Sequence, residues 1–178
     1  MFISVKEQKF FCDWYFRAQL DENYDSDRQF FYFYALFNHL FQIYCEEHEK
    51  MIKNQGLKLE NGERSKIMFF LYNIFFVESI KSNFETYNPF ATLKSGQLTL
   101  LIDKFHIESN DEVLTTFRLP PFEILSKLFM EIYKLRCDLF HGSADLSDCN
   151  NYKLIDEANV VLKGFLERLF DTNLSENK

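Results

Sequence analysis

The sequence predicts an all-α protein, a bundle of packed helices, and three observations support this prediction. Apolar residues recur at helical spacing along almost the whole chain. Only 5 of the 178 residues are glycine and 3 are proline, while 47% are hydrophobic and 22 are phenylalanine, so most of the chain is expected to be packed regular structure. No stretch alternates polar and apolar residues as a strand would. We expect one helical domain over residues 1–178, because single domains usually hold about 100 to 200 residues.

The amino-terminal part is expected to form two helices. The first covers Val5 to about Leu20 and ends before the acidic, turn-prone segment DENYDSD. The second starts at Ser26, which is expected to form a capping box with Gln29, and runs to about Asn54, where Gly56 can end it. Its first half, FFYFYALFNHLF, is apolar almost all round. This pattern predicts burial on more than one side of the helix, some of it against a second subunit.

The middle of the chain is expected to begin with a third helix after Gly62, from Glu63 to about Asn83. Its most apolar stretch, Ile67 to Val77, is shorter than the roughly 20 residues that span a bilayer, so we interpret it as a buried helix. The segment NPFATLKSGQ contains proline and glycine and is expected to be a connection. Shorter helices are expected at Leu98 to Phe105 and at Asp111 to Phe117.

The carboxyl-terminal part is expected to contain two long helices. The proline pair at 120–121 should open the first of them, because proline is tolerated in the first turn of a helix. This helix should run to His141, with Gly142 as its terminator. After the polar loop SADLSDCNN, the last helix is expected from about Tyr152 to Phe170, and residues 171–178 are expected to be a frayed tail.

Charge and cysteine content restrict the classes of function. Twenty basic residues against 27 acidic ones give a net charge of −7, which argues against a protein that coats nucleic acid through diffuse electrostatics. The four cysteines are too sparse and irregularly spaced for a disulfide framework or a paired zinc motif, so we interpret them as reduced thiols. Charges interrupt the apolar residues near the amino terminus, and no signal peptide is visible. A cytoplasmic protein without a membrane-spanning segment is expected.

The candidate chemistry lies in the segment IYKLRCDLFHGSADLSDC, where Arg136 and His141 stand at the carboxyl end of a predicted long helix. A cation that binds phosphate, beside a base that titrates near neutrality, is a minimal set for cleaving a phosphodiester. Five residues at about 3.6 per turn rotate the two side chains by roughly 140° from each other. Their convergence therefore requires Arg136 to reach along the helix axis, the last turn to distort at Gly142, or a second subunit to supply partner groups.

This segment resembles the HEPN family of helical domains, in which an arginine precedes a histidine by four to six residues near a helix end. The match here is Arg136, four residues, then His141 and Gly142, within the string YKLRCDLFHG. The helix that carries RQFFYFYALFNHLF is similar to the aromatic-rich opening helix of such domains. Phe37 and Asn38 stand where many members have the same dipeptide. The resemblance covers residues 26–170.

The resemblance implies a homodimeric helical bundle that acts as a metal-independent endoribonuclease without a cofactor. His141 would assist removal of the proton from a ribose 2′-hydroxyl, and Arg136 would stabilise the charge that develops on the phosphate. The residue after the arginine is commonly polar in active members and is Cys137 here, so Asp138 either substitutes for it or is only solvated. Members act in toxin–antitoxin, anti-phage and RNA-processing systems, which implies RNA as substrate, an antitoxin or effector protein as a possible partner, and no DNA substrate.

Two other interpretations of the motif remain open. In the first, Arg136 forms a surface ion pair with Glu131 or Asp138, and His141 is a favourable charge at a helix end. In the second, the chain is a catalytically silent HEPN-like module that dimerises and binds a protein partner, and Cys137 marks the lost activity.

The remaining polar and aromatic clusters are interpreted as structural. Cys45 and His48 lie three apart on a helix, with His39 further up it, but without a second cluster they predict an ordinary helix surface and no metal site. The aromatic run Trp14–Phe16 is expected to lie in the core.

Overall fold

The structure is a computed structural model, and it describes residues 5–19, 25–54, 62–76 and 122–175. Within these ranges all regular structure is helical. The helices are α1 (Val5–Gln19), α2 (Ser26–Asn54), α3 (Glu63–Phe76), α7 (Phe122–Phe140) and α8 (Cys149–Ser175). The predicted all-α class is therefore confirmed for the described residues. The stop at Gly56, the continuation of the third helix to Asn83, the proline pair at 120–121 and the helices expected at 98–105 and 111–117 lie outside them.

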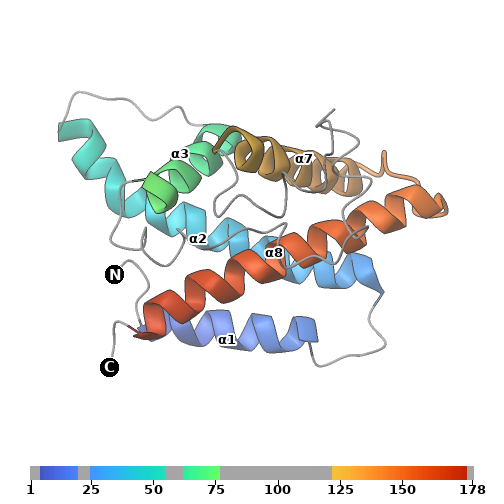
Figure 1. Cartoon of the computed structure of the whole chain (residues 1–178), viewed down its shortest axis with the longest axis horizontal. Helices are drawn as coiled ribbons and strands as arrows, with labels where there is room; N and C mark the ends of the chain where they lie inside the picture. Colours follow the sequence, from blue (N-terminus) through green and yellow to red (C-terminus); the bar gives the residue numbers. More distant parts are fainter. Residues whose placement is uncertain (1–4, 20–24, 55–61, 77–121, 176–178) are drawn as a thin grey trace, which may run out of the picture.

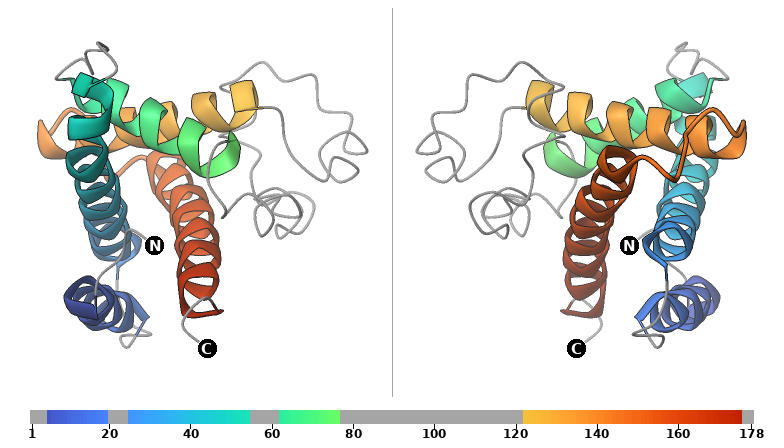
Figure 2. Two further views of the ribbon diagram at one scale, coloured as in Figure 1. Left: turned by 90° about the vertical axis from the view of Figure 1, so that its left-hand side faces the viewer. Right: turned by 90° about the vertical axis from the view of Figure 1, so that its right-hand side faces the viewer.

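The long helix α2 is at the centre of the bundle and packs against α8, α1 and α3, while α3 also packs against α7 (Figure 1). The two end-on views show α3 and α7 side by side across one side of the bundle, with α1 on the opposite side (Figure 2). The apolar first half of α2 is thus buried on several sides, as its composition predicts. Phe31 is the exception, because its ring remains exposed.

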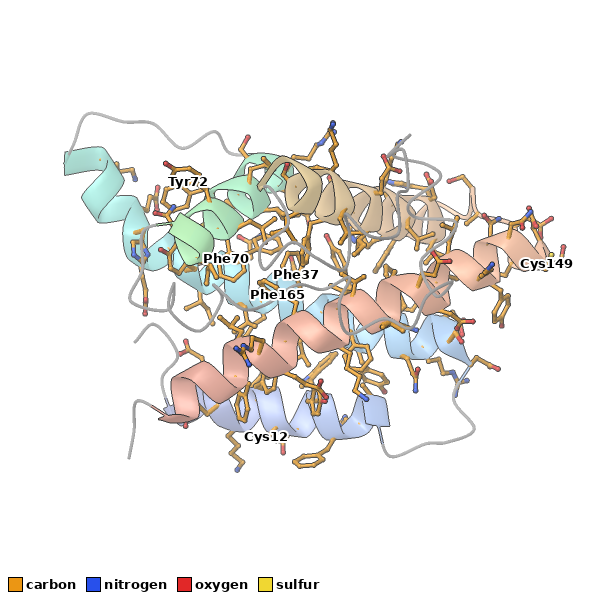
Figure 3. The ribbon with its side chains drawn as sticks, in the orientation of Figure 1. Cys12, Phe37, Phe70, Tyr72, Cys149 and Phe165 are labelled. Atoms are coloured by element: carbon orange, nitrogen blue, oxygen red, sulfur yellow. The ribbon has the colours of Figure 1, made fainter. Side chains whose placement is uncertain are left out.

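Four phenylalanines, one each from α2, α3, α7 and α8, meet in the centre of the core. The Phe37 ring lies 5.0 Å from that of Phe129, 5.9 Å from Phe165 and 6.0 Å from Phe70. Figure 3 shows Phe37, Phe70 and Phe165 converging between their helices, and all four side chains are fully buried or nearly so. Offset and edge-to-face ring pairs of this kind add stability beyond the burial of their area.

The helix α1 joins the bundle through aromatic contacts. The Phe11 ring stacks on Phe170 of α8 at 4.4 Å, and the Tyr15 hydroxyl donates a hydrogen bond to the Glu167 carboxylate of the same helix. Trp14 and Tyr15 pack against the core, as expected. The expectation was wrong for Phe16, which is 56% exposed. It follows Tyr15 directly and therefore points about 100° away from it around the helix.

The predicted capping box at the start of α2 was wrong. The first helical hydrogen bond runs from the Gln29 N–H to the Asp25 carbonyl, so the cap position is Asp25 rather than Ser26. The Gln29 side chain donates instead to the carbonyl of Ala18, at 3.3 Å, which links α2 to the end of α1. Gln29 therefore bonds to the end of another helix and not to the local backbone N–H that the sequence pattern favours.

The bounds of α8 also differ from the prediction. The helix starts at Cys149 because the Asp148 carboxylate accepts from the Asn150 N–H at 2.9 Å, a side-chain cap that the polar composition of the loop obscured. It continues to Ser175, so the frayed tail expected at 171–178 was wrong for residues 171–175. That stretch contains no proline or glycine to end a helix already formed. Within the described ranges, none of the helices is both long and apolar enough to cross a bilayer.

Candidate functional site

Arg136 lies on the side of α7 that faces α2 and α3. Ile132, one turn earlier on the same face, is fully buried, so the arginine extends the apolar face to its edge. Its Nη1 lies 3.9 Å from a carboxylate oxygen of Glu63, at the start of α3. Its Cζ lies 4.4 Å from the ring centroid of Phe140 and 5.7 Å from that of Tyr34. A carboxylate and two aromatic rings therefore hold the guanidinium in place.

The guanidinium of Arg136 is a partly buried cation. Its side chain is 27% exposed, and its Nε is buried and lacks a hydrogen-bond partner among the described residues. Burial by itself lowers the pKa of Arg136, but the neighbouring Cys137 sulfur and the Glu63 carboxylate more than offset this, and the pKa is raised overall. The side chain therefore carries its full charge, and its buried Nε–H is unpaired among the described residues.

Two tyrosines complete the surroundings of Arg136. The Tyr34 hydroxyl donates to Glu63 Oε1 at 3.4 Å, and burial followed by the Glu63 charge raises the pKa of Tyr34 far above its ordinary value. The pKa of Tyr133 is also raised, first through its hydrogen bond with Cys137 and then by burial. Both phenols therefore stay neutral at physiological pH. Glu63 accepts from Tyr34 and pairs with Arg136 at the same time.

His141 is exposed at the end of α7, in the turn that stops the helix. Its backbone N–H still donates to the Cys137 carbonyl at 2.9 Å. Gly142 then adopts a φ of 66°, its N–H donates to Leu139, and the Ser143 N–H donates back to the Asp138 carbonyl at 2.9 Å. This pair of bonds is a Schellman motif, and it confirms Gly142 as the predicted terminator. The helix itself ends at Phe140, so His141 is its cap residue.

Asp138 is exposed and is connected to the same turn. Its carbonyl accepts from the Ser143 hydroxyl at 3.1 Å, and its carboxylate oxygen lies 3.4 Å from that hydroxyl. These bonds assign Asp138 a role in ending the helix.

The structure places the sequence-predicted residues at one end of α7 but does not join their side chains. Within the described ranges, no hydrogen bond or ion pair links the side chains of Arg136, Asp138 and His141 to one another. The interpretation of Arg136 as a partner of Glu131 or Asp138 was wrong, because Glu131 pairs with Lys134 at 3.2 Å and Arg136 pairs with Glu63. The sequence reasoning did not find Glu63, Tyr34 or Phe140 as neighbours of Arg136. For Phe140 a signal was present, because it follows Arg136 by four residues and therefore lies on the same face of the helix.

The other polar cluster weighed in the sequence has structural partners. The Phe10 ring packs on His39 at 4.4 Å, and His48 stacks on Tyr44 while its Nδ1 lies 2.8 Å from the Tyr44 carbonyl. The Cys45 thiol donates to the Lys66 carbonyl at 3.6 Å. No group of three or more histidine, cysteine, aspartate and glutamate side chains in the described part of the chain has the geometry of a metal site.

Fold and site together define a helical bundle with a fixed arginine and an exposed histidine at one helix end. No protein-family model, curated protein or solved structure matches the chain.

Proposed function

We propose that the chain is a HEPN-type endoribonuclease that cleaves RNA without a metal ion or cofactor. One observation supports the proposal most directly. A fully charged, partly exposed guanidinium and an exposed histidine five residues further along the chain lie together at the end of α7. A phosphate can approach the first while a ribose hydroxyl approaches the second.

In the proposed reaction His141 takes the proton from the ribose 2′-hydroxyl, and the 2′-oxygen attacks the adjacent phosphorus. The bond from phosphorus to the 5′-oxygen of the next nucleotide breaks, and that oxygen takes a proton from water while His141 returns its proton to the solvent. The products are a 2′,3′-cyclic phosphate and a free 5′-hydroxyl. Arg136 stabilises the negative charge on the phosphoryl oxygens, and Asp138 supports the turn that carries His141.

A homodimer is part of the proposal. Phe31 of α2 and Phe140 of α7 both expose their rings, which meet edge to face at 5.2 Å beside Arg136. Adjacent exposed aromatic rings are typical of the centre of a protein interface. Pairing two copies through this patch brings two Arg136 and two His141 residues to one cleft, which removes the need for both groups to converge within one chain.

We infer the biological setting from the resemblance to the HEPN family. We place the enzyme in the cytoplasm, in a toxin–antitoxin, anti-phage or RNA-processing system, where an antitoxin or effector protein controls it.

A silent interaction module is the second candidate, and the contact between Arg136 and Glu63 favours it. A carboxylate 3.9 Å away neutralises part of the charge that a phosphate would need. Cys137 also favours this candidate, because active members of the family usually have a polar residue at that position. In this case the exposed Phe31 and Phe140 serve dimerisation and partner binding alone.

Incubation of the purified protein with total RNA, with and without a chelator, separates the two candidates. The endoribonuclease cleaves RNA in both conditions, and both His141→Ala and Arg136→Ala abolish cleavage while helical content by circular dichroism is unchanged. Lys134→Ala, which removes an exposed cation from the same helix, keeps full activity. A folded dimer that leaves RNA intact establishes the silent module instead.

Light scattering at micromolar concentration tests the proposed assembly. The wild type is expected to be dimeric, and Phe140→Asp is expected to shift it to monomer because a charge cannot be buried in an apolar interface at low cost. A monomeric wild type contradicts both the dimer and the composite cleft.

A further inference from the structure

A cleft of about 330 Å³ lies between α1 and the carboxyl-terminal part of α8 (Figure 1). Four of the six described residues that line it are aromatic, and the six are Phe11, Cys12, Tyr15, Phe16, Glu167 and Phe170. The helix α7, which carries Arg136, contributes none of these lining residues. The cleft is therefore separate from the proposed catalytic end of α7.

The rings that line the cleft have two orientations. The Phe11 ring is nearly parallel to Phe170, with centroids 4.4 Å apart and planes 8° apart, and nearly parallel to Tyr15 at 5.6 Å and 11°. The Phe16 ring is turned by 73° from that of Tyr15. Aromatic rings attract one another both when stacked with an offset and when they meet edge to face. The lining therefore offers both kinds of contact to a flat ring.

Phe16 is the most exposed apolar residue of this lining. Its side chain is 56% exposed, whereas Phe11 is buried. A single exposed phenylalanine on a surface needs no explanation, but Phe16 continues an aromatic cleft that extends inward to Phe11. A ligand that covers Phe16 removes its apolar surface from water, and this burial stabilises the complex.

Size and charge restrict the class of ligand. The volume is at the lower end of small-molecule sites, about 300 to 1,000 Å³, and suits one or two fused rings rather than a helix about 10 Å across. Glu167 is the charged residue of the lining, with a side chain 46% exposed, and it repels anions. It also accepts from the Tyr15 hydroxyl and lies 4.0 Å from Lys163, which weakens its attraction for a cation. An uncharged ligand fits this lining best.

We propose that this cleft binds a small, uncharged aromatic molecule of one or two fused rings. The parallel rings of Phe11 and Phe170 and the turned ring of Phe16 supply the contacts. The proposal is independent of ribonuclease activity, because it uses no residue of the proposed catalytic set.

Titration of the full-length protein with indole, followed by two-dimensional amide NMR, tests the proposal. Saturable shifts are expected at the backbone amides of Cys12 and Phe16. Indole-3-acetate has the same rings and a carboxylate, and it is expected to bind at least about fivefold more weakly because Glu167 repels it. No saturable shift with indole, or equal binding of the two compounds, overturns the proposal.

Two matched variants locate the ligand. Phe16→Ala is expected to weaken indole binding at least about fivefold, because it removes an exposed ring of the lining. Circular dichroism checks that the fold is kept. Tyr72→Ala removes another exposed ring, 50% exposed on α3 and away from Cys12 and α1 (Figure 3), and is expected to leave the affinity unchanged. Unchanged affinity in Phe16→Ala, or equal losses in both variants, contradicts a specific site.

Discussion

At the scale of single residues, Arg136 is held in a fixed position before any ligand arrives. Glu63 neutralises part of its charge, Phe140 and Tyr34 cover its guanidinium, and the Nε remains without a partner among the described residues. A side chain that is already ordered loses less conformational entropy when it binds a phosphate. The same contacts make Arg136 a weaker attractor of anions than a free arginine. The balance of these two effects decides between the two proposed functions.

Cys45 provides a residue-scale prediction about thiol reactivity. Burial raises the pKa of the Cys45 thiol from 9.0 to about 11, and only the thiolate reacts with iodoacetamide. The thiol of Cys149, in contrast, is exposed at the start of α8 (Figure 3). We expect alkylation at pH 8, followed by peptide mass spectrometry, to modify Cys149 first and Cys45 at least about tenfold more slowly. Equal rates at the two cysteines in the folded protein would contradict the burial of Cys45.

The same pKa shift makes stability depend on pH in a defined direction. Below about pH 9 the thiol of Cys45 is protonated in both the folded and the unfolded chain, and its contribution to stability is complete. Between about pH 9 and 11 the unfolded chain loses this proton while the folded chain keeps it, so the free energy of unfolding falls as pH rises. Cys45→Ala should reduce this fall.

The position of Arg136 and His141 at a helix end could be predicted from the sequence, but their surroundings could not. Their place at the end of a helix follows from local signals, namely the apolar periodicity before them and Gly142 after them. Glu63 lies far away in the sequence and reaches Arg136 only because α3 packs on α7. No pattern within one segment encodes such a contact.

At the scale of elements, the end of α7 is fixed by a single backbone conformation. Gly142 has a φ of 66°, where any other residue is strained, although nothing within 4 Å would touch an added Cβ. Gly142→Ala should therefore lower the free energy of unfolding by about 1 kcal/mol through backbone strain alone. Gly142→Asn should cost less, because asparagine tolerates the left-handed conformation better.

Urea denaturation of the two Gly142 variants measures this difference. An alanine variant as stable as the wild type would mean that the turn takes another conformation in solution. In that case the position assigned to His141 would also be wrong.

The starts and ends of the helices show which local signals are reliable. Gly142 ended α7 as predicted, because only glycine fits that φ at no cost. The capping box at Ser26 did not form, because Gln29 found a partner on another helix. The start of α8 was missed because three capping residues, Ser147, Asp148 and Asn150, lie close together, and only the structure shows that Asp148 is the one used. The sequence is therefore least informative where several similar residues compete to cap the same helix end.

At the scale of the whole molecule, the four central phenylalanines connect helices from both ends of the chain. Phe165 lies 5.0 Å from Phe129, 5.9 Å from Phe37 and 6.2 Å from Phe70, and it is fully buried. Phe165→Ala should therefore lower the free energy of unfolding by about 3 to 5 kcal/mol, through lost burial and the cavity left behind.

Phe16→Ala is the matched control, because the same side chain is removed from a surface where it is 56% exposed. Its effect on the free energy of unfolding should stay within about 0.5 kcal/mol. Chemical denaturation followed by circular dichroism measures both variants. Similar losses for the two would contradict the position of the core.

The all-α class could be predicted from helical periodicity and the scarcity of glycine and proline, because both are local properties of the chain. The arrangement of the helices could not, since the first half of α2 is apolar almost all round and can pack with several partners. A cleft of about 430 Å³ between α1, α2 and α8 was not predicted for the same reason. It exists only where residues from both ends of the chain meet.

The central claim is that Arg136 and His141 cleave RNA through the ribose 2′-hydroxyl, and the sugar of the substrate tests it most directly. Three single-stranded oligonucleotides of one sequence are compared in the presence of a chelator: RNA, RNA methylated at every 2′-oxygen, and DNA. The account predicts that only the unmodified RNA is cut, that mass spectrometry finds 2′,3′-cyclic phosphate ends, and that His141→Ala abolishes them. Cleavage of the DNA or of the methylated RNA, or ends without cyclic phosphate, would contradict it.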